Sequence, residues 1–166
     1  MWYNKRRNEI TMRPTKKYIL ISLGAILVLI QLIQPARNKS GQVFPTDFSK
    51  MYVVPDNVHK LLINACYDCH SNNTSYPWYA NFQPVAWLMA NHIKNGKANL
   101  NLSVFGSYAP RRQISKLRDM ADQVRDNEMP LLSYKIIHRK ARLSKEERIQ
   151  LSQWLNNIAD SLLAKN

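Results

Sequence analysis

The chain has 166 residues, of which 24 are Lys or Arg, 11 are Asp or Glu and two are Cys. This length allows one domain of ordinary size with an appended segment and excludes two large domains. With 45% hydrophobic residues, the chain has material for a core and is not of the disordered class. Two cysteines are too few for the disulfide framework of a small secreted scaffold. The formal net charge of +13 raises nucleic-acid binding as a hypothesis that depends on where the charges lie.

An uncharged apolar segment lies close to the N-terminus. Residues 1–17 hold six basic side chains and one acid, and residues 18–33 follow without a single charge. This pattern predicts a transmembrane helix over 18–35, slightly short of the roughly 20 residues of a full span. No small-x-small cleavage site follows it, so we expect an uncleaved signal anchor rather than a signal peptide. Met12 is an alternative start that keeps a positive flank.

Charge asymmetry orients this span. Because basic residues crowd its N-terminal side, residues 1–17 are expected in the cytoplasm and the rest of the chain in the periplasm, anchored in the inner membrane. The exported part then holds 18 basic and 10 acidic residues, a net charge of +8. Membrane orientation thus explains much of the basic excess, and we predict no nucleic-acid partner. The residual charge suits an acidic redox protein or anionic lipid headgroups.

The exported part divides into a tether and a folded domain. Residues 36–52 are polar, contain Pro and Gly and have no sustained period, which predicts a flexible tether. The folded domain is expected over 53–166. Its apolar spacing predicts helices near 56–65, 84–95, 110–126 and 144–162. Gly96 is expected to end the second of these, and no strand pattern of convincing length occurs, so the predicted fold class is all-α.

One short motif carries recognisable chemistry. Cys66-Tyr67-Asp68-Cys69-His70 is C-x-x-C-H, the attachment signature of c-type haem. One helical turn can place both thiols against the vinyl groups on one porphyrin edge, while the adjacent imidazole reaches the iron. We therefore predict one covalent haem c, with thioethers at Cys66 and Cys69 and His70 as the proximal ligand.

Two other kinds of site also use closely spaced cysteines. A thioredoxin-like dithiol is expected in a βαβ context, which this sequence lacks. A zinc site would need a further ligand, for which His92 and His138 are the candidates.

The sixth iron ligand is expected from a residue distant in sequence. Met129 follows a predicted helix and precedes Pro130, where an extended chain can present a thioether to the haem. His92 is the alternative distal ligand, and an open or water-filled position is a third reading. His59 and His138 are expected to be solvated.

Three tryptophans are candidates to wall a haem pocket, because a small domain gains much of its core from the cofactor. They are Trp78, Trp87 and Trp154. Each is explained equally well as an ordinary core residue.

Several motifs occur together in an order typical of one family. They are the C-x-x-C-H motif, Tyr76-Pro77-Trp78-Tyr79-Ala80-Asn81, Gln83-Pro84-Val85-Ala86-Trp87, Leu100-Asn101, Phe105-Gly106-Ser107-Tyr108, and Glu128-Met129-Pro130-Leu131 with Ser133-Tyr134. Over roughly residues 55–160 the chain resembles the bacterial haem-binding domain family, small membrane-anchored or secreted monohaem proteins related to class I cytochromes c. The resemblance implies covalent haem c, axial ligation by His70 and Met129, and a periplasmic setting.

These features predict a membrane-tethered electron carrier rather than an enzyme, working with a redox protein that the motifs do not specify. One alternative is a catalytic or sensory haem protein with an exchangeable distal position. The other is a haem-bearing structural subunit of a membrane complex.

Overall fold

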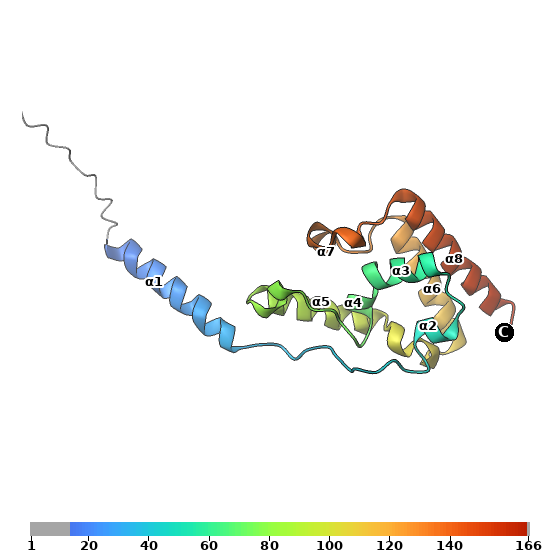
Figure 1. The fold of residues 1–166 in the computed structure, drawn as a ribbon, viewed down its shortest axis with the longest axis horizontal. Helices are drawn as coiled ribbons and strands as arrows, with labels where there is room; N and C mark the ends of the chain where they lie inside the picture. The colour runs from blue at the N-terminus through green and yellow to red at the C-terminus, as the bar shows by residue number, and fades with distance from the viewer. Residues whose placement is uncertain (1–13, 166) are drawn as a thin grey trace, which may run out of the picture.

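The computed structural model describes residues 14–165, and this part of the chain is all-helical (Figure 1), which confirms the predicted class. The described residues form eight α-helices and four short 3-10 helices, with no strand. In chain order they are α1 (Pro14–Leu29), η1 (Ile30–Leu32), α2 (Phe48–Met51), α3 (Asp56–Ala65), α4 (Tyr67–His70), η2 (Trp78–Asn81), α5 (Val85–Asn99), η3 (Leu102–Ser107), α6 (Pro110–Arg125), α7 (Leu132–Ile137), η4 (Arg139–Ala141) and α8 (Lys145–Leu163).

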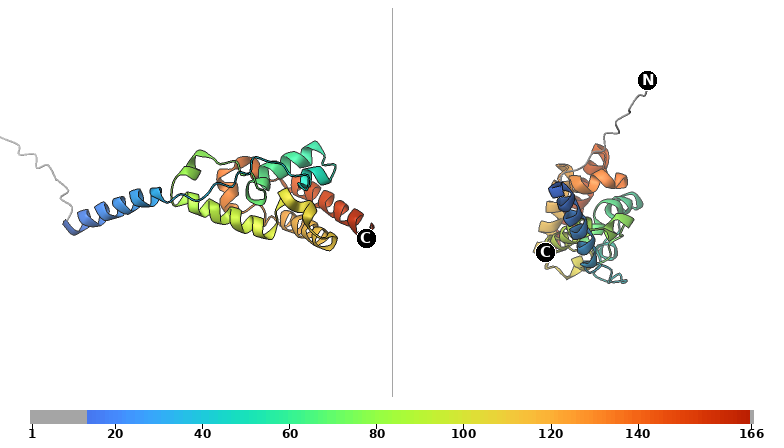
Figure 2. Two further views of the ribbon diagram at one scale, coloured as in Figure 1. Left: turned by 90° about the horizontal axis from the view of Figure 1, so that it is seen from below. Right: turned by 90° about the vertical axis from the view of Figure 1, so that its left-hand side faces the viewer.

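The N-terminal apolar segment forms a helix that projects from the rest of the protein (Figures 1 and 2). Within it, Thr15–Leu32 is long and apolar enough to cross a membrane, and none of this stretch is buried in the protein. A helix of this kind is either a signal sequence or a membrane anchor. Most of the basic segment expected before the span, residues 1–13, lies outside the described residues.

Residues 36–52 do not form the free tether that the sequence predicts, because they pack along the domain. The Asn38 side chain donates a hydrogen bond to Thr74 Oγ1 at 2.9 Å, and the Asn38 carbonyl accepts one from the Thr74 backbone at the same distance. Further along, Phe48 is fully buried, with its ring 5.0 Å from that of Phe105. The segment looks unstructured in sequence because its partners are distant residues.

The helix expected over 84–95 continues to Asn99, so the prediction that Gly96 ends it was wrong. Gly96 lies where α5 touches α4. A Cβ atom at this position would come within 2.6 Å of the Cys69 carbonyl oxygen, closer than real Cβ contacts. The glycine therefore serves close packing of two helices and does not terminate one.

The other three predicted helices correspond to α3, α6 and α8. At the start of α8, the Ser144 hydroxyl accepts a hydrogen bond from the Glu147 backbone at 3.1 Å. The Glu147 carboxylate in turn accepts one from the Ser144 backbone at 2.7 Å. This reciprocal pair is a capping box, which satisfies two backbone donors that the helix leaves free.

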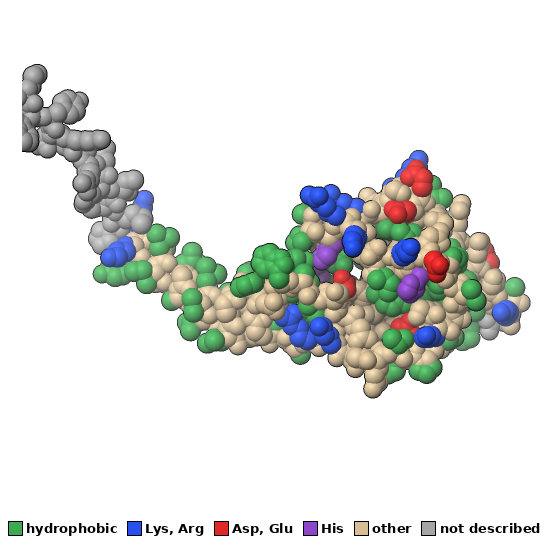
Figure 3. All heavy atoms as spheres, viewed as in Figure 1, with side chains coloured by type: hydrophobic (Ala, Val, Ile, Leu, Met, Phe, Trp, Pro, Cys, Tyr) green, Lys and Arg blue, Asp and Glu red, His purple; other side chains and the backbone are tan. Residues whose placement is uncertain are grey.

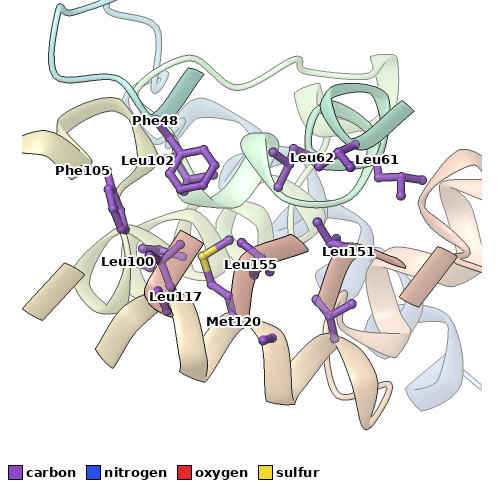
Figure 4. Close-up of a cluster of buried hydrophobic side chains, with 14 residues drawn as sticks. Phe48, Leu61, Leu62, Leu100, Leu102, Phe105, Leu117, Met120, Leu151 and Leu155 are labelled. Atoms are coloured by element: carbon purple, nitrogen blue, oxygen red, sulfur yellow. The ribbon is translucent and has the colours of Figure 1, made fainter. Parts of the chain in front are cut away.

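The core lies where α6 and α8 pack against each other beneath α3 and η3 (Figure 4). Its largest fully buried side chains are Phe48, Phe105, Leu62, Leu102, Leu117, Leu151 and Leu155. Two core residues, Met120 and Val124 on α6, also face a neighbouring cavity. One helix therefore supports the core and forms part of the wall of the site.

Candidate haem site

The C-x-x-C-H motif forms a single tight turn after α3. Cys66 caps α3 with φ −122° and ψ −46°, and α4 begins at the next residue. The Cys66 carbonyl accepts hydrogen bonds from the backbones of Cys69 at 3.2 Å and His70 at 2.9 Å. Both cysteines are free thiols. The turn thus carries two thiols and an imidazole within one helical repeat, as the sequence predicts.

A cavity of about 550 Å³ adjoins this turn. Its volume lies within the roughly 300–1,000 Å³ typical of cofactor pockets. The C-x-x-C-H turn, one face of α5, one face of α6 and the chain after α6 form its walls. Among its lining residues are Cys66, Cys69, His70, His92 and Met129. The structure therefore brings together the expected attachment residues, the expected proximal ligand and both candidates for the distal position.

His70 is held in the orientation and tautomer that iron ligation needs. Its Nδ1 lies 3.0 Å from the Leu100 carbonyl oxygen. Because a carbonyl only accepts, Nδ1 carries the proton and Nε2 keeps its lone pair for a metal. Burial lowers the pKa of His70, so the imidazole is neutral at pH 7. Sequence spacing identifies His70 but does not reveal the carbonyl that orients it.

The two thiols are protonated at neutral pH. Burial, together with the neighbouring Cys69, raises the pKa of Cys66 to about 12. Burial and the charge of Asp68 raise the pKa of Cys69 to about 11. A redox dithiol needs the opposite, an attacking cysteine whose pKa is lowered.

The zinc alternative finds no support in the structure. Within residues 14–165, no group of three or more His, Cys, Asp or Glu side chains is placed to hold a metal ion. A porphyrin fits this site better than a bare metal ion does. The cavity is large, the thiols are protonated, and the imidazole keeps a free Nε2.

Met129 reaches the cavity through a tight reversal of the chain rather than the extended segment expected from the sequence. Asn127, with φ 61°, ends α6 in the left-handed conformation. The backbones of Glu128 and Met129 both donate to the Gln123 carbonyl, at 2.9 and 3.1 Å. Lys135 Nζ donates to Asn127 Oδ1 at 2.9 Å and ties the reversal to α7. The position of Met129 is therefore fixed by the end of α6.

None of the three candidate tryptophans lines the cavity. Trp78 is 76% exposed, Trp87 donates its indole N–H to the Ile33 carbonyl at 3.1 Å, and Trp154 packs edge-on against Phe48 in the core. Size and aromaticity alone gave no information on the direction in which each ring points. The walls instead use residues that sequence reasoning missed, namely Asn95, Gly96, Leu100, Lys116, Met120 and Tyr134. Their three- and four-residue spacing on α5 and α6 is the one signal that could have found some of them.

A polar network braces the motif from outside. The Tyr134 hydroxyl donates to Asp68 Oδ2 at 2.6 Å, and the Tyr134 ring stacks on His138 at 3.9 Å. His138 Nε2 lies 2.7 Å from the Tyr79 hydroxyl. His138 is therefore not the solvated residue that the sequence suggests. The network connects α4, α7 and η2 beside the cavity.

Replacing Gly96 by alanine is expected to destabilise the domain. Alanine normally stabilises a helix interior by roughly 1 kcal/mol over glycine. In this position the added methyl meets a backbone oxygen that cannot rotate away, and overpacking of this kind costs about 1–3 kcal/mol. Chemical unfolding of the purified full chain, followed by circular dichroism, measures the change.

Gly24→Ala is the matched control, because a Cβ atom there meets nothing within 4 Å. It should leave the unfolding of the domain unchanged. A Gly96→Ala chain as stable as the parent would show that α4 and α5 do not depend on this close approach.

A comparison with known families agrees with this site. The model of a haem-binding domain matches residues 25–157, which is most of the chain and includes every residue of the cavity. Neither a curated protein nor a solved structure gives a significant match. The matched stretch holds the cysteine pair, the imidazole and the cavity together. The chain therefore belongs to the haem-binding domain family.

Proposed function

We propose that this chain is a membrane-anchored monohaem c-type cytochrome that transfers electrons in the periplasm. The observation that carries the proposal is that Cys66, Cys69, His70 and Met129 all line the same cavity. Two thiols, an imidazole and a thioether are the donor set of a six-coordinate haem c.

Each of these residues has a distinct role in the proposal. Cys66 and Cys69 would hold a haem through thioethers, and His70 would bind its iron through Nε2 while Leu100 holds the Nδ1 proton. Met129, on the chain reversal after α6, would supply a second iron ligand. A bound haem would supply the one-electron couple of its iron. The helices around the cavity exclude water and keep both ligands in place, in a cytochrome c-like arrangement.

An electron carrier rather than an enzyme follows if both axial positions are filled by the protein, since no site is then left for a substrate. His92 supports the second candidate function, a catalytic or sensory haem protein. It lines the same cavity and is available to a small molecule or to the iron if the Met129 position opens.

The apolar helix supports the anchored part of the proposal. Thr15–Leu32 has the length and composition of a span, and none of this stretch is buried in the protein. With the basic segment before it in the cytoplasm, the haem domain lies in the periplasm, where c-type haem is attached. A structural subunit of a larger membrane complex would use the same anchor and differs only in its partner.

Haem staining of cell fractions on a denaturing gel tests the proposal. We expect the full chain to stain in the membrane fraction and to stay there after an alkaline carbonate wash, because covalent haem survives denaturation and a span resists extraction. Staining in the soluble fraction would show that the helix is cleaved. A chain that binds haem in its native state but does not stain would refute covalent attachment.

A further inference from the structure

A patch of exposed apolar side chains lies on η2, the residue after it and α7. We call it the η2/α7 face, made of Trp78, Phe82, Leu132, Ile136 and Ile137. Trp78 is 76% exposed, Leu132 70% and Ile136 61%. Leu132 and Ile136 are four residues apart and share one side of α7. Clustered exposure of this kind marks a surface that binds something.

The face is firmly built. The Trp78 and Phe82 rings pack edge to face, with centroids 6.1 Å apart and an angle of 74° between the ring planes. Its two halves are joined by the hydrogen bond between Tyr79 and His138, and α7 is fixed to α4 by the bond from Tyr134 to Asp68. The exposed apolar side chains therefore lie on a segment that hydrogen bonds and ring contacts hold in place.

The face lies beside the end of the apolar N-terminal helix. Gln83 donates from its backbone to Gln31 Oε1 at 2.9 Å and from its side chain to the Ile33 carbonyl at 2.7 Å. Trp87 Nε1 donates to the same carbonyl. Figures 1 and 2 show α7 and the segment before α5 on the side of the body that faces α1. A membrane that holds α1 would thus meet this side of the domain first.

Basic side chains lie on the α7 half of the face and in the segment that follows it. Residues 132–142 contain Lys135, Arg139, Lys140 and Arg142 and no acid. In the described part of the chain the ion pairs involve other cations, all on α6. Figure 3 shows Lys and Arg side chains gathered at the α7 corner, whereas many of the acidic ones lie towards α6 and α8. The charge distribution is complementary to an anionic surface.

We propose that the η2/α7 face rests in the headgroup layer of the membrane that holds α1, with anionic phospholipids as its partner. Aromatic rings prefer this layer, and short apolar helices flanked by Lys and Arg lie in it. The inference rests on the anchor of the proposed function. It goes further, because it names the face of the domain that meets the lipid and the kind of lipid that binds it. Leu131 and Tyr134, at the start of α7 and within it, also line the cavity. Docking of α7 on the lipid would therefore bring the haem site close to the bilayer.

Spin-label accessibility tests the docking. The full chain with Ile136→Cys is purified with haem, labelled with a nitroxide and placed in vesicles of phosphatidylcholine and phosphatidylglycerol. Val53→Cys is the matched control, because Val53 is 94% exposed and follows α2, on the side away from α1 (Figure 1). We expect oxygen to collide more often than a nickel chelate with the label at 136, and the reverse order at 53. Leaving out phosphatidylglycerol should reduce the difference.

Nickel accessibility at 136 equal to that at 53 would overturn the docking. So would a label shielded only after membrane proteins are added, since the face would then bind protein. The parent chain, labelled in parallel, reports on the proposed function separately. Nitroxide uptake by the parent shows that Cys66 and Cys69 carry no thioethers, whatever the label at 136 reports. Loss of the chain from carbonate-washed vesicles would refute the anchor and the docking together.

Discussion

Replacing Cys66 and Cys69 together by alanine removes all haem staining of the chain on a denaturing gel. Ligation by His70 depends on the folded cavity and is lost on denaturation, so only thioethers can keep haem on the unfolded chain. The sequence has only these two cysteines, so the double variant has no other thiol that could attach the haem. In-gel peroxidase staining beside an immunoblot measures the loss.

The single variants serve as controls for folding. Cys66→Ala and Cys69→Ala each keep one thioether, so each should stain. The reduced spectrum in alkaline pyridine should shift toward that of a haem with one free vinyl group. Staining that persists in the double variant would contradict covalent attachment through this motif.

Replacing Met129 by alanine lowers the haem reduction potential and opens the sixth position. A thioether favours reduced iron, so its loss should lower the potential by a fraction of the roughly 0.8 V range that axial ligands cover. Met129 is held at the cavity by the reversal after α6, and alanine can keep that backbone. Redox titration measures the potential, and carbon monoxide binding to the reduced protein reports the open position.

His92→Ala discriminates between the two candidate distal ligands. If Met129 binds the iron, His92→Ala keeps the parent potential and gains no carbon monoxide binding. Met129→His should restore a six-coordinate haem at a lower potential than the parent. If Met129→Ala keeps the parent potential and His92→Ala binds carbon monoxide, His92 and not Met129 is the distal ligand. That outcome would favour the sensory or catalytic function.

The sequence predicted the helices α3, α6 and α8 because each carries its own signal. Apolar spacing, a capping box and a first-turn proline act within a few residues and are readable without tertiary contacts. The helix α5 was predicted too short, because a glycine near a helix end usually indicates that the helix stops there. At Gly96 the glycine instead allows another segment of the chain to pack closely. The close approach of Cys69 decided that position, and no local pattern encodes it.

The sequence likewise predicted some residues of the candidate site and missed others. C-x-x-C-H is a motif of five consecutive residues, and the chemistry of one haem edge dictates its spacing. The tryptophans were misplaced because their size does not specify a direction. Trp87 instead contacts Ile33, and Trp154 contacts Phe48.

By itself, the sequence determined the apolar N-terminal helix, the all-α class and the attachment motif, because each depends on neighbouring residues. Only the tertiary structure decided that residues 36–52 pack on the domain and that His70 is oriented by Leu100. It also decided that Met129 and His92 share one cavity with the motif. These features join residues roughly 20 or more positions apart in the chain. Their pairing arises from burial and hydrogen-bond satisfaction across the whole fold, which spacing along the chain does not record.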